Sequence, residues 1–530
     1  MNDARELLKQ GKTSLGIELG STRIKAVLIG EDYLPIASGG FDWQNSFENG
    51  VWTYKLEDAW SGIQAAFRAL TGEVKSKYGV ELRAVGSIGI SAMMHGYLAF
   101  DSGGEQLAEF RTWRNTTTAQ AAEALSAEFD FSVPQRWSIA HLYQAVLNGE
   151  EHVSSIDSLT TLSGYIHQKL TGEKVLGIGD ASGMLPIDSV SLNYDAVMMD
   201  KFDALVADKN FTWKINELLP RVLSAGDSAG FLTDEGARLL SPEGLLRAGI
   251  PLCPPEGDAG TGMVATNSIR PATGNISAGT SIFAMVVLEK ALSKVYPEID
   301  IVTTPSGSPV AMVHCNNCTG DLDAWVKLFG ELGGMLGADI SKSALYDILY
   351  SSALNGNAAN SGLVAYNYYS GEHLTGLEHG RPMLARMPEG AFNIPNLMRT
   401  LLFSAIATLK IGMEILNEEN VTLNQMMGHG GLFKTKDIGQ LIMASALNVP
   451  VSVMDSAGEG GAWGIALLAA YLRDKRNDES MADFLEKRVF ADMKGSQQAA
   501  DGKISADFEA FMQRYRAGLA VERAAVESLL

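Results

Sequence analysis

Cysteine is scarce in this chain of 530 residues, which has only three, at positions 253, 315 and 318. The last two form a C-x-x-C pair, but a zinc site needs about four ligands and no second pair is present. We therefore expect buried, reduced thiols in a cytoplasmic protein.

Long apolar runs are also absent. No stretch approaches the roughly 18 residues of a membrane span, and the best candidate, residues 401–416, carries Lys410 and Glu414. The first residues, MNDARELLKQGKTS, are polar and do not resemble a signal peptide. We expect 401–416 to be a core helix.

Positive charge is in deficit, with 42 Lys and Arg against 62 Asp and Glu and a net charge of −20. Such a chain is a poor partner for nucleic acid or an anionic membrane, so we expect neither. The hydrophobic content of 46% is typical of a globular protein. Because 530 residues exceed what one core usually holds, the length favours two domains.

Two common nucleotide motifs are missing: the chain has no G-x-x-x-x-G-K-[ST] loop and no G-x-G-x-x-G opening a helix after a strand. It has instead a repeated hairpin pattern. Strands predicted at 15–19 and 24–29 flank Gly20-Ser21-Thr22, and NISAGTSIFAMVVL (275–288) repeats strand, glycine, two hydroxyl residues and strand. The repeat favours two related domains joined near residue 265, the alternative being two unrelated hairpins.

Elsewhere, short β-like runs alternate with helical patterns, which favours an α/β fold. Residues 474–505 are polar and charged, and a final helix-like segment ends at Leu530; we predict that this tail is a peripheral extension. A loop is predicted at 458–464. The other predicted elements are strands at 84–91 and 450–454 and helices at 59–78, 119–128, 396–418, 437–447 and 465–474.

A glycine turn flanked by hydroxyl residues presents N–H and O–H donors, which suits a phosphate chain. Seven motifs in order resemble the FGGY family of carbohydrate kinases over residues 16 to about 470. They are GIELGSTRIK, SAMMHGYLAFD, EGDAGTG, SAGTS, YYSGE, GHGGLFKTK and GEGGAWG.

The resemblance implies an α/β fold of two ribonuclease H-like domains, as in the actin, hexokinase and Hsp70 superfamily, with a cleft between them. Residues 1–264 would hold the sugar pocket, the first phosphate loop and the catalytic acid. Residues 265–530 would hold the second phosphate loop, the adenosine loop and the C-terminal extension. The cofactors implied are ATP and Mg²⁺.

By the same resemblance, Asp258 of EGDAGTG is the general base that accepts a proton from a sugar hydroxyl. Glu18 helps to organise Mg²⁺ through water, although the family usually has Asp there; the alternative is a solvated carboxylate at a strand edge. The nucleotide contacts implied are Gly20, Ser21, Thr22, Lys25, Gly279, Thr280, Ser281, Gly430, Gly431 and Glu459.

Met94-His95-Gly96 is similar to the xylulokinase type within the family and implies sugar contacts. Trp113 is retained in a second sugar segment, whereas Asn115 stands where Asp is expected and Thr117 where Arg is expected. We expect an ATP-dependent kinase acting on a ketopentose, D-xylulose to xylulose 5-phosphate first. An L-ribulokinase, another ketose or polyol kinase, a hydrolase of the same fold and an actin-like nucleotide-binding regulator stay open. Relatives are often dimers, so a homodimer is also open.

Overall fold

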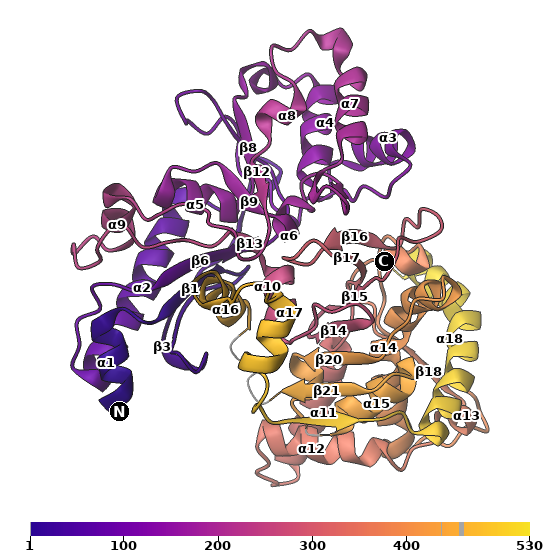
Figure 1. Ribbon diagram of the computed structural model, residues 1–530. Coiled ribbons are helices and arrows are strands. Elements are labelled where there is room, and N and C mark those ends of the chain that lie inside the picture. Colours follow the sequence, from indigo (N-terminus) through magenta and orange to yellow (C-terminus); the bar gives the residue numbers. More distant parts are fainter. Residues whose placement is uncertain (1, 436, 455–459, 530) are drawn as a thin grey trace. The chain divides into compact units, whose positions relative to one another are not determined.

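The computed structural model describes residues 2–435, 437–454 and 460–529, which form two compact α/β units (Figure 1). Neither unit is one continuous stretch of chain, because segments from the middle and the end return to unit 1. The predicted α/β class is confirmed, whereas the single division at 264/265 stays a prediction. Unit 1 comprises Met1–Ile269, Asp300–Val310 and Gly458–Asp492, and unit 2 comprises Arg270–Ile299, Ala311–Ala457 and Met493–Leu530.

Unit 1 is built on a five-stranded sheet in the order β13-β6-β1-β2-β3. Strands β1 and β2 are antiparallel and form the first predicted hairpin, while β1 runs parallel to β6. The strands are β1 (Ser14–Leu19), β2 (Arg23–Ile29), β3 (Pro35–Asp42), β6 (Ser87–Ala92) and β13 (Glu256–Gly257).

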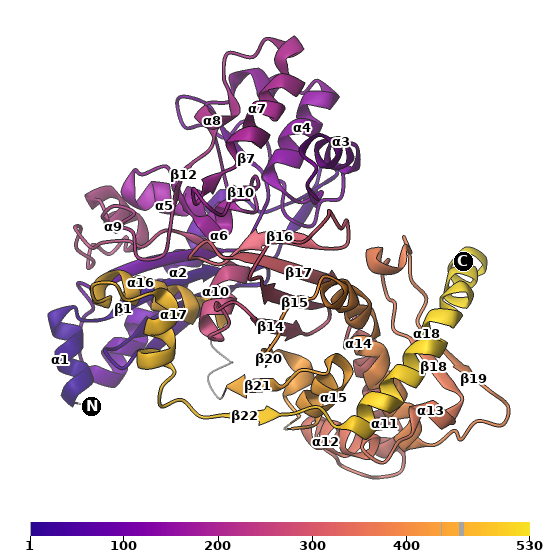
Figure 2. The same ribbon diagram turned by 45° about the vertical axis from the view of Figure 1, so that its right-hand side comes forward.

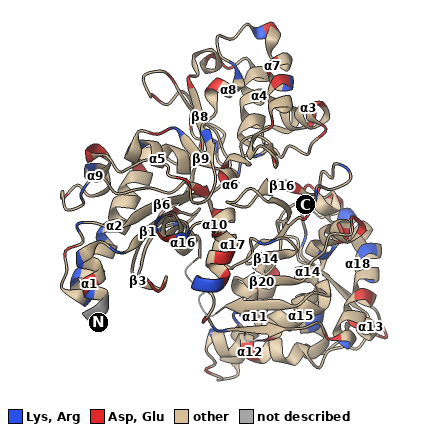
Figure 3. Ribbon diagram, in the orientation of Figure 1, with Lys and Arg blue, Asp and Glu red and all other residues tan. Residues whose placement is uncertain are grey.

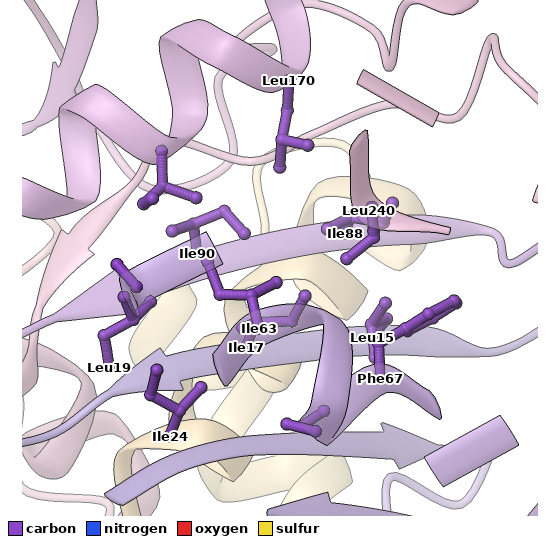
Figure 4. Close-up of a cluster of buried hydrophobic side chains, with 14 of the residues drawn as sticks. Leu15, Ile17, Leu19, Ile24, Ile63, Phe67, Ile88, Ile90, Leu170 and Leu240 are labelled. Carbon is purple, nitrogen blue, oxygen red and sulfur yellow. The ribbon is translucent and has the colours of Figure 1, made fainter. Parts of the chain in front are cut away.

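The residues of β1 alternate between two faces of the sheet, as a strand requires. Leu15, Ile17 and Leu19 are fully buried and pack with side chains of α2 (Leu56–Tyr78) in the main core of this unit (Figure 4). Glu18 therefore lies on the opposite face, where β1 contacts α16 (Gly460–Asp474). Its place in an otherwise apolar strand follows from this alternation.

Helix α16 corrects the predicted loop at 458–464, because the described part of that segment is helical from Gly460 onward. Its glycines serve close packing: a Cβ atom on Gly464 would lie 2.0 Å from the Thr261 carbonyl oxygen in α10 (Asp258–Ala265). Gly16 in β1 is equally constrained, since its Cβ would lie 2.1 Å from the Ala462 carbonyl oxygen. Glycine in these positions lets helix and strand backbones approach.

Unit 2 repeats the arrangement. Strands β14 and β15 form the second predicted antiparallel hairpin, and β14 runs parallel to β20, as β1 does to β6. The repeat of hairpins seen in the sequence is thus confirmed as a repeat of topology. The strands lie in the order β17 (Pro309–Cys315), β15 (Ile282–Val287), β14 (Thr273–Ala278), β20 (Gln425–His429), β21 (Val451–Met454) and β22 (Gly495–Gln498).

Among the described residues, one helix, α14 (Ile394–Glu418), is long and apolar enough to cross a membrane by length and composition alone. Its most apolar window is 78% buried inside the fold. It packs with α11 (Gly320–Met335), α12 (Lys342–Ala353) and α15 (Ile438–Leu447). The expected core helix is therefore confirmed.

The C-terminal segment is integral to the fold, with residues up to Asp492 in unit 1 and Met493–Leu530 in unit 2, so its prediction as a peripheral extension was wrong. Strand β22 pairs with β21, and helix α18 (Gly502–Ser528) lies along α13 (Ala358–Ser361), α14 and α15 (Figure 2). Phe508 and Phe511 of α18 are fully buried and contact the Phe403 ring. The polar composition of residues 474–505 suggested an exposed tail, although the helix that follows has an apolar, buried face.

Both signs of charge are scattered over outer helices such as α1 (Asn2–Gln10) and α18 (Figure 3). The three cysteines are buried and unpaired, as expected. The other helices and strands used below are β5 (Val51–Thr53), α4 (Ser138–Asn148), α5 (Leu162–Thr171), α6 (Ile178–Ala181) and β16 (Asp300–Thr303).

Candidate active site

Asp258 is the first residue of α10 and follows directly on β13. Its Oδ1 accepts the Met94 N–H at 3.2 Å. Gly257 permits this approach, because a Cβ there would lie 2.1 Å from Met94 Cγ. Burial raises the pKa of Asp258 to about 6, against the opposing effect of the N–H groups of Met94 and Ala259. The predicted base and the predicted sugar segment therefore meet at the ends of neighbouring strands.

The predicted sugar-binding segment, Met94-His95-Gly96, has an unusual backbone conformation. His95 has φ +69° and Gly96 has φ +98°, both in the left-handed region, which is uncommon for a residue other than glycine. The His95 side chain is 5% exposed, with Nδ1 at 3.4 Å from the Gly183 carbonyl oxygen and its ring stacked on Trp137. The surrounding structure thus determines where the imidazole lies.

The second sugar segment lies beside the first, because the Tyr97 N–H donates to the Arg111 carbonyl at 2.9 Å. Asn115 does not present its amide to an open space. Its Oδ1 accepts the Trp52 N–H at 2.8 Å and its Nδ2 donates to the Trp52 carbonyl at 2.9 Å. Asn115 therefore ties this segment to β5, and Trp113, which is 38% exposed, is the more accessible of the two.

Glu18 is partly exposed at the end of β1, directly opposite Lys25 on β2. Its Oε2 accepts the Ala462 N–H at 3.1 Å. Burial and the neighbouring Asp258 raise the pKa of Glu18 to about 7, while Lys25 acts in the opposite direction. The acid of the first hairpin is thus in electrostatic range of the candidate base.

Glu18 and Asp258 offer carboxylate oxygens, which are the kind of ligand that Mg²⁺ accepts in proteins. No cluster of three or more His, Cys, Asp or Glu side chains that could hold a metal exists among the described residues. Mg²⁺ needs no such cage, since it is usually bound through one or two carboxylates, waters and substrate phosphates. A divalent cation would also relieve the repulsion between Glu18 and Asp258.

Two aromatic residues donate hydrogen bonds to backbone carbonyls of the first predicted phosphate loop, Gly20-Ser21-Thr22. Trp43 donates from Nε1 to the Gly20 carbonyl at 2.7 Å and from its backbone N–H to the Thr22 carbonyl at 3.1 Å. The Tyr54 hydroxyl donates to the Ser21 carbonyl at 2.6 Å. Since these carbonyls are engaged and Ser21 and Thr22 are exposed, the loop can offer hydroxyl and N–H groups to a phosphate.

The second predicted phosphate loop, in unit 2, follows the same plan. The Gly279 carbonyl accepts from the N–H and the hydroxyl of Thr319, at 3.0 and 2.8 Å. The Thr280 carbonyl accepts the Cys318 N–H at 2.8 Å. Thr280 is exposed, Ser281 is partly exposed, and a Cβ on Gly279 would meet open space. One residue of the C-x-x-C pair therefore supports this loop.

The structure also brings the predicted adenosine loop next to the second phosphate loop. Gly430 has φ +101°, and a Cβ there would lie 2.5 Å from the Ala278 carbonyl oxygen, so the position requires glycine. Gly431 begins a short 3₁₀ turn, Gly431–Phe433, and both glycines are exposed. Glu459 lies outside the described residues.

Sequence reasoning missed several residues that support the site. Trp43, Tyr54 and Thr319 act on loops far from them in sequence, and no local pattern marks such contacts. Two buried acids, Asp180 and Glu256, were also missed, although Glu256 stands inside the EGDAGTG motif. Burial raises the pKa of Asp180 to about 7 and that of Glu256 to about 8.

Two α/β units, each with a glycine–hydroxyl hairpin beside a parallel strand, define a two-domain protein with the actin- and hexokinase-like fold. The family models agree and are more specific: the N-terminal domain of the FGGY family of carbohydrate kinases matches residues 13–264, and its C-terminal domain matches residues 274–473. The chain therefore belongs to the FGGY family of carbohydrate kinases. It is a sugar kinase, and kinases of this family use ATP as the phosphate donor.

Individual relatives are distant. A xylulose kinase of Haemophilus influenzae is 22% identical over 483 residues, covering 89% of this chain and 92% of the relative. A solved xylulose kinase from Rhodospirillum rubrum has a TM-score of 0.77 at 19% identity and covers 96% and 98% of the two chains. A gluconate kinase from Lactobacillus acidophilus has the same TM-score at 16% identity, covering 97% and 98%. At such identities the solved structures establish the fold, not the sugar.

Proposed function

We propose that the chain phosphorylates a ketopentose, D-xylulose to xylulose 5-phosphate before other ketoses. The observation that carries the proposal is the 3.2 Å hydrogen bond from the Met94 N–H to Asp258, which joins the candidate sugar segment to the candidate base. The similarity to xylulose kinases supports it. The proposal includes a cytoplasmic location, where ATP is available to such a kinase.

In this mechanism, Asp258 accepts the proton of the attacking sugar hydroxyl, which is typically worth ~10²–10⁴ in rate. Met94 orients the carboxylate, and His95 positions the sugar through hydrogen bonds. The loop around Ser21 in unit 1 and the loop around Thr280 in unit 2 each offer N–H and hydroxyl donors to a phosphate group. Mg²⁺, held through Glu18, would supply positive charge to the transferring phosphoryl group when bound.

A different sugar has one specific observation in its favour. Asn115 stands where the family usually has an acid, and its amide is taken up by the backbone of Trp52. A subsite altered in this way supports an L-ribulokinase, or another ketose or polyol kinase, as the second candidate.

The test is ADP release with MgATP and a panel of D-xylulose, L-ribulose, D-ribulose, glycerol and gluconate. We expect the greatest stimulation and the highest kcat/KM with D-xylulose. Higher values with another sugar would reassign the substrate. Turnover with none of these sugars would overturn the ketopentose proposal.

His95→Ala should raise the KM for the sugar by about tenfold, roughly the loss of one hydrogen bond, and leave the KM for ATP nearly unchanged. The reason is that His95 lies in the segment beside Asp258 and not in a phosphate loop. His379→Ala, an exposed histidine of unit 2, is the control. Equal changes in both KM values would argue against a sugar contact.

Glu18→Gln should raise the Mg²⁺ concentration needed for half-maximal rate by about tenfold, which is typical for loss of an outer-shell carboxylate. Glutamine keeps the size and one acceptor for the Ala462 N–H, so the fold is retained. The measurement is a Mg²⁺ titration at saturating ATP and sugar, with the exposed Glu31→Gln as control. An unchanged titration would place Glu18 outside the metal site.

A further inference from the structure

Two carboxyl groups are buried next to the candidate base without taking part in the site described above. Glu256 is 1% exposed and stands in β13, two residues before Asp258. Asp180 is fully buried in α6. The strongest opposing influences on the pKa of Glu256 are backbone N–H groups, and Asp180 adds to the effect of burial.

Glu256 bonds to the backbone of a distant segment, residues 177–183, called the anchor segment below. Its Oε1 accepts the Gly179 N–H at 3.2 Å, and its Oε2 accepts the Asp180 N–H at 2.9 Å. The segment has no side chains where the carboxyl lies: a Cβ on Gly177 would be 2.2 Å from Oε1, and one on Gly179 would be 2.4 Å from Oε2. The glutamate thus joins its own strand to the anchor segment.

The C-terminal end of the anchor segment, Gly183, contacts His95, the candidate sugar-binding residue. The Gly183 carbonyl lies 3.4 Å from His95 Nδ1, and a Cβ on Gly183 would be 2.5 Å from that nitrogen. Any shift of the anchor segment would therefore move Gly183, which packs against the His95 imidazole. Glu256 acts at one end of this short segment and His95 at the other.

Asp180 secures the middle of the anchor segment. Its Oδ2 accepts hydrogen bonds from the hydroxyls of Thr161, at 2.6 Å, and of Ser163. Its Oδ1 has no hydrogen-bond partner among the described residues and lies 3.2 Å from the Cβ position of Gly257. The anchor segment is therefore held on α5 and faces the backbone that carries Asp258.

A further pair of bonds ties the anchor segment to β16. The Thr303 N–H donates to the Ser182 hydroxyl at 3.1 Å, and the Thr303 hydroxyl donates to the Ile178 carbonyl at 3.0 Å. With α5, β13 and β16 all bonded to it, the anchor segment is a junction of this unit and not a surface loop. Atoms at such a junction are held in fixed positions, as the groups that flank a reacting substrate must be.

We propose that Glu256 is a positioning residue that keeps His95 and Asp258 in one fixed relation through the anchor segment, so that a bound sugar hydroxyl faces the base. The proposal rests on the ketopentose-kinase function proposed above and adds a residue that is not among the predicted sugar and nucleotide contacts. Misplacement of reacting groups by about 1 Å can cost ~10²-fold in rate. An anchor of this kind therefore affects catalysis without contacting the substrate.

The first test needs no substrate. Hydrogen exchange followed by mass spectrometry compares the full chain with Glu256→Ala and Glu256→Gln. In the alanine variant, amides of the anchor segment and of residues 93–97 should exchange faster; glutamine, which fills the space and keeps one acceptor, should be intermediate. Glu372→Ala is the matched control, since Glu372 is also fully buried and accepts the Asn316 N–H at 2.8 Å, but in unit 2.

The second test is kinetic. Glu256→Ala should lower kcat by about 10- to 100-fold and raise the KM for the sugar, with an unchanged KM for ATP and with partial recovery in Glu256→Gln. A merely structural role would lower the active fraction without this split. If the alanine variant does not fold, Glu256→Asp, which is too short to reach both N–H groups, replaces it in both tests.

Unchanged exchange in the anchor segment, or a glutamine variant no better than alanine, would overturn the proposal. Because exchange is measured without sugar or ATP, that result is distinct from failure of the proposed function. Faster exchange in the alanine variant of a chain that phosphorylates no ketopentose would retain the anchor and reject the proposed substrate. Unchanged exchange in the alanine variant, together with kinase activity of the parent chain on the ketopentose, would reject the anchor and retain the proposed substrate.

Discussion

Asp258→Asn is expected to lower kcat by about 10²–10⁴-fold, the usual contribution of a general base, while MgATP still binds. Asparagine keeps the shape and can still accept the Met94 N–H, but it cannot take a proton from the sugar hydroxyl. The loss should therefore be in the chemical step and not in the fold. The measurements are steady-state kinetics with the best sugar of the panel and calorimetric titration with MgATP.

The control for this variant is Asp188→Asn. Asp188 also accepts backbone N–H groups of unit 1, from Val190 and Ser191, but in a surface turn. Its replacement should change kcat by less than about threefold, as surface substitutions usually do. Near-normal turnover of Asp258→Asn would remove this residue as the base and leave only its structural bond to Met94.

The sequence predicted the parts of the fold that depend on local pattern. The apolar runs around Gly20 and Gly279 were long enough to be recognised as strands, and their hairpins are present in the structure. Glu18 could be identified as unusual because it interrupts such a run. These signals are local, and a single segment is enough to read them.

What could not be predicted depends on contacts between distant segments. The segment 460–464 is rich in glycine, which favours a loop by composition. Its glycines instead let α16 pack against Glu18 and Thr261, some 440 and 200 residues away. Likewise, Trp43 and Tyr54 support a loop that lies more than 20 residues upstream. Tertiary packing overrides local preference in both cases.

The candidate site divides in the same way. The candidate base, Asp258, and the candidate sugar contact, His95, were found from motifs. The residues that position them, Glu256 and Gly183, became visible only through distances. Asn115 is the instructive case, because the motif suggested a sugar contact and its hydrogen bonds go to the backbone of β5.

Asp507→Ala is expected to lower the free energy of unfolding of unit 2 by about 3–5 kcal/mol, the usual result of breaking a buried ion pair. Arg399 lies 3.3 Å from Asp507, and the exposed fractions of the two side chains are 6% and 10%. The same carboxylate accepts the N–H groups of Ala358 and Ala359. Removing it would leave the buried guanidinium without its counter-charge, bonded to the Gly356 carbonyl, and would leave two backbone N–H groups without their acceptor.

The matched control is Glu509→Ala, two residues along the same helix. Glu509 pairs with Lys410 at 2.9 Å, but its side chain is 52% exposed, and Glu414 also lies within 4.0 Å of Lys410. Exposed pairs contribute about 0–1 kcal/mol, so this variant should be nearly neutral. Native-state hydrogen exchange of α14 and α18 amides measures both variants. If the two substitutions cost the same, the Arg399–Asp507 pair would contribute no more to stability than an exposed pair. A large difference instead means that the buried ion pair fastens the last helix to α14 in the core of unit 2.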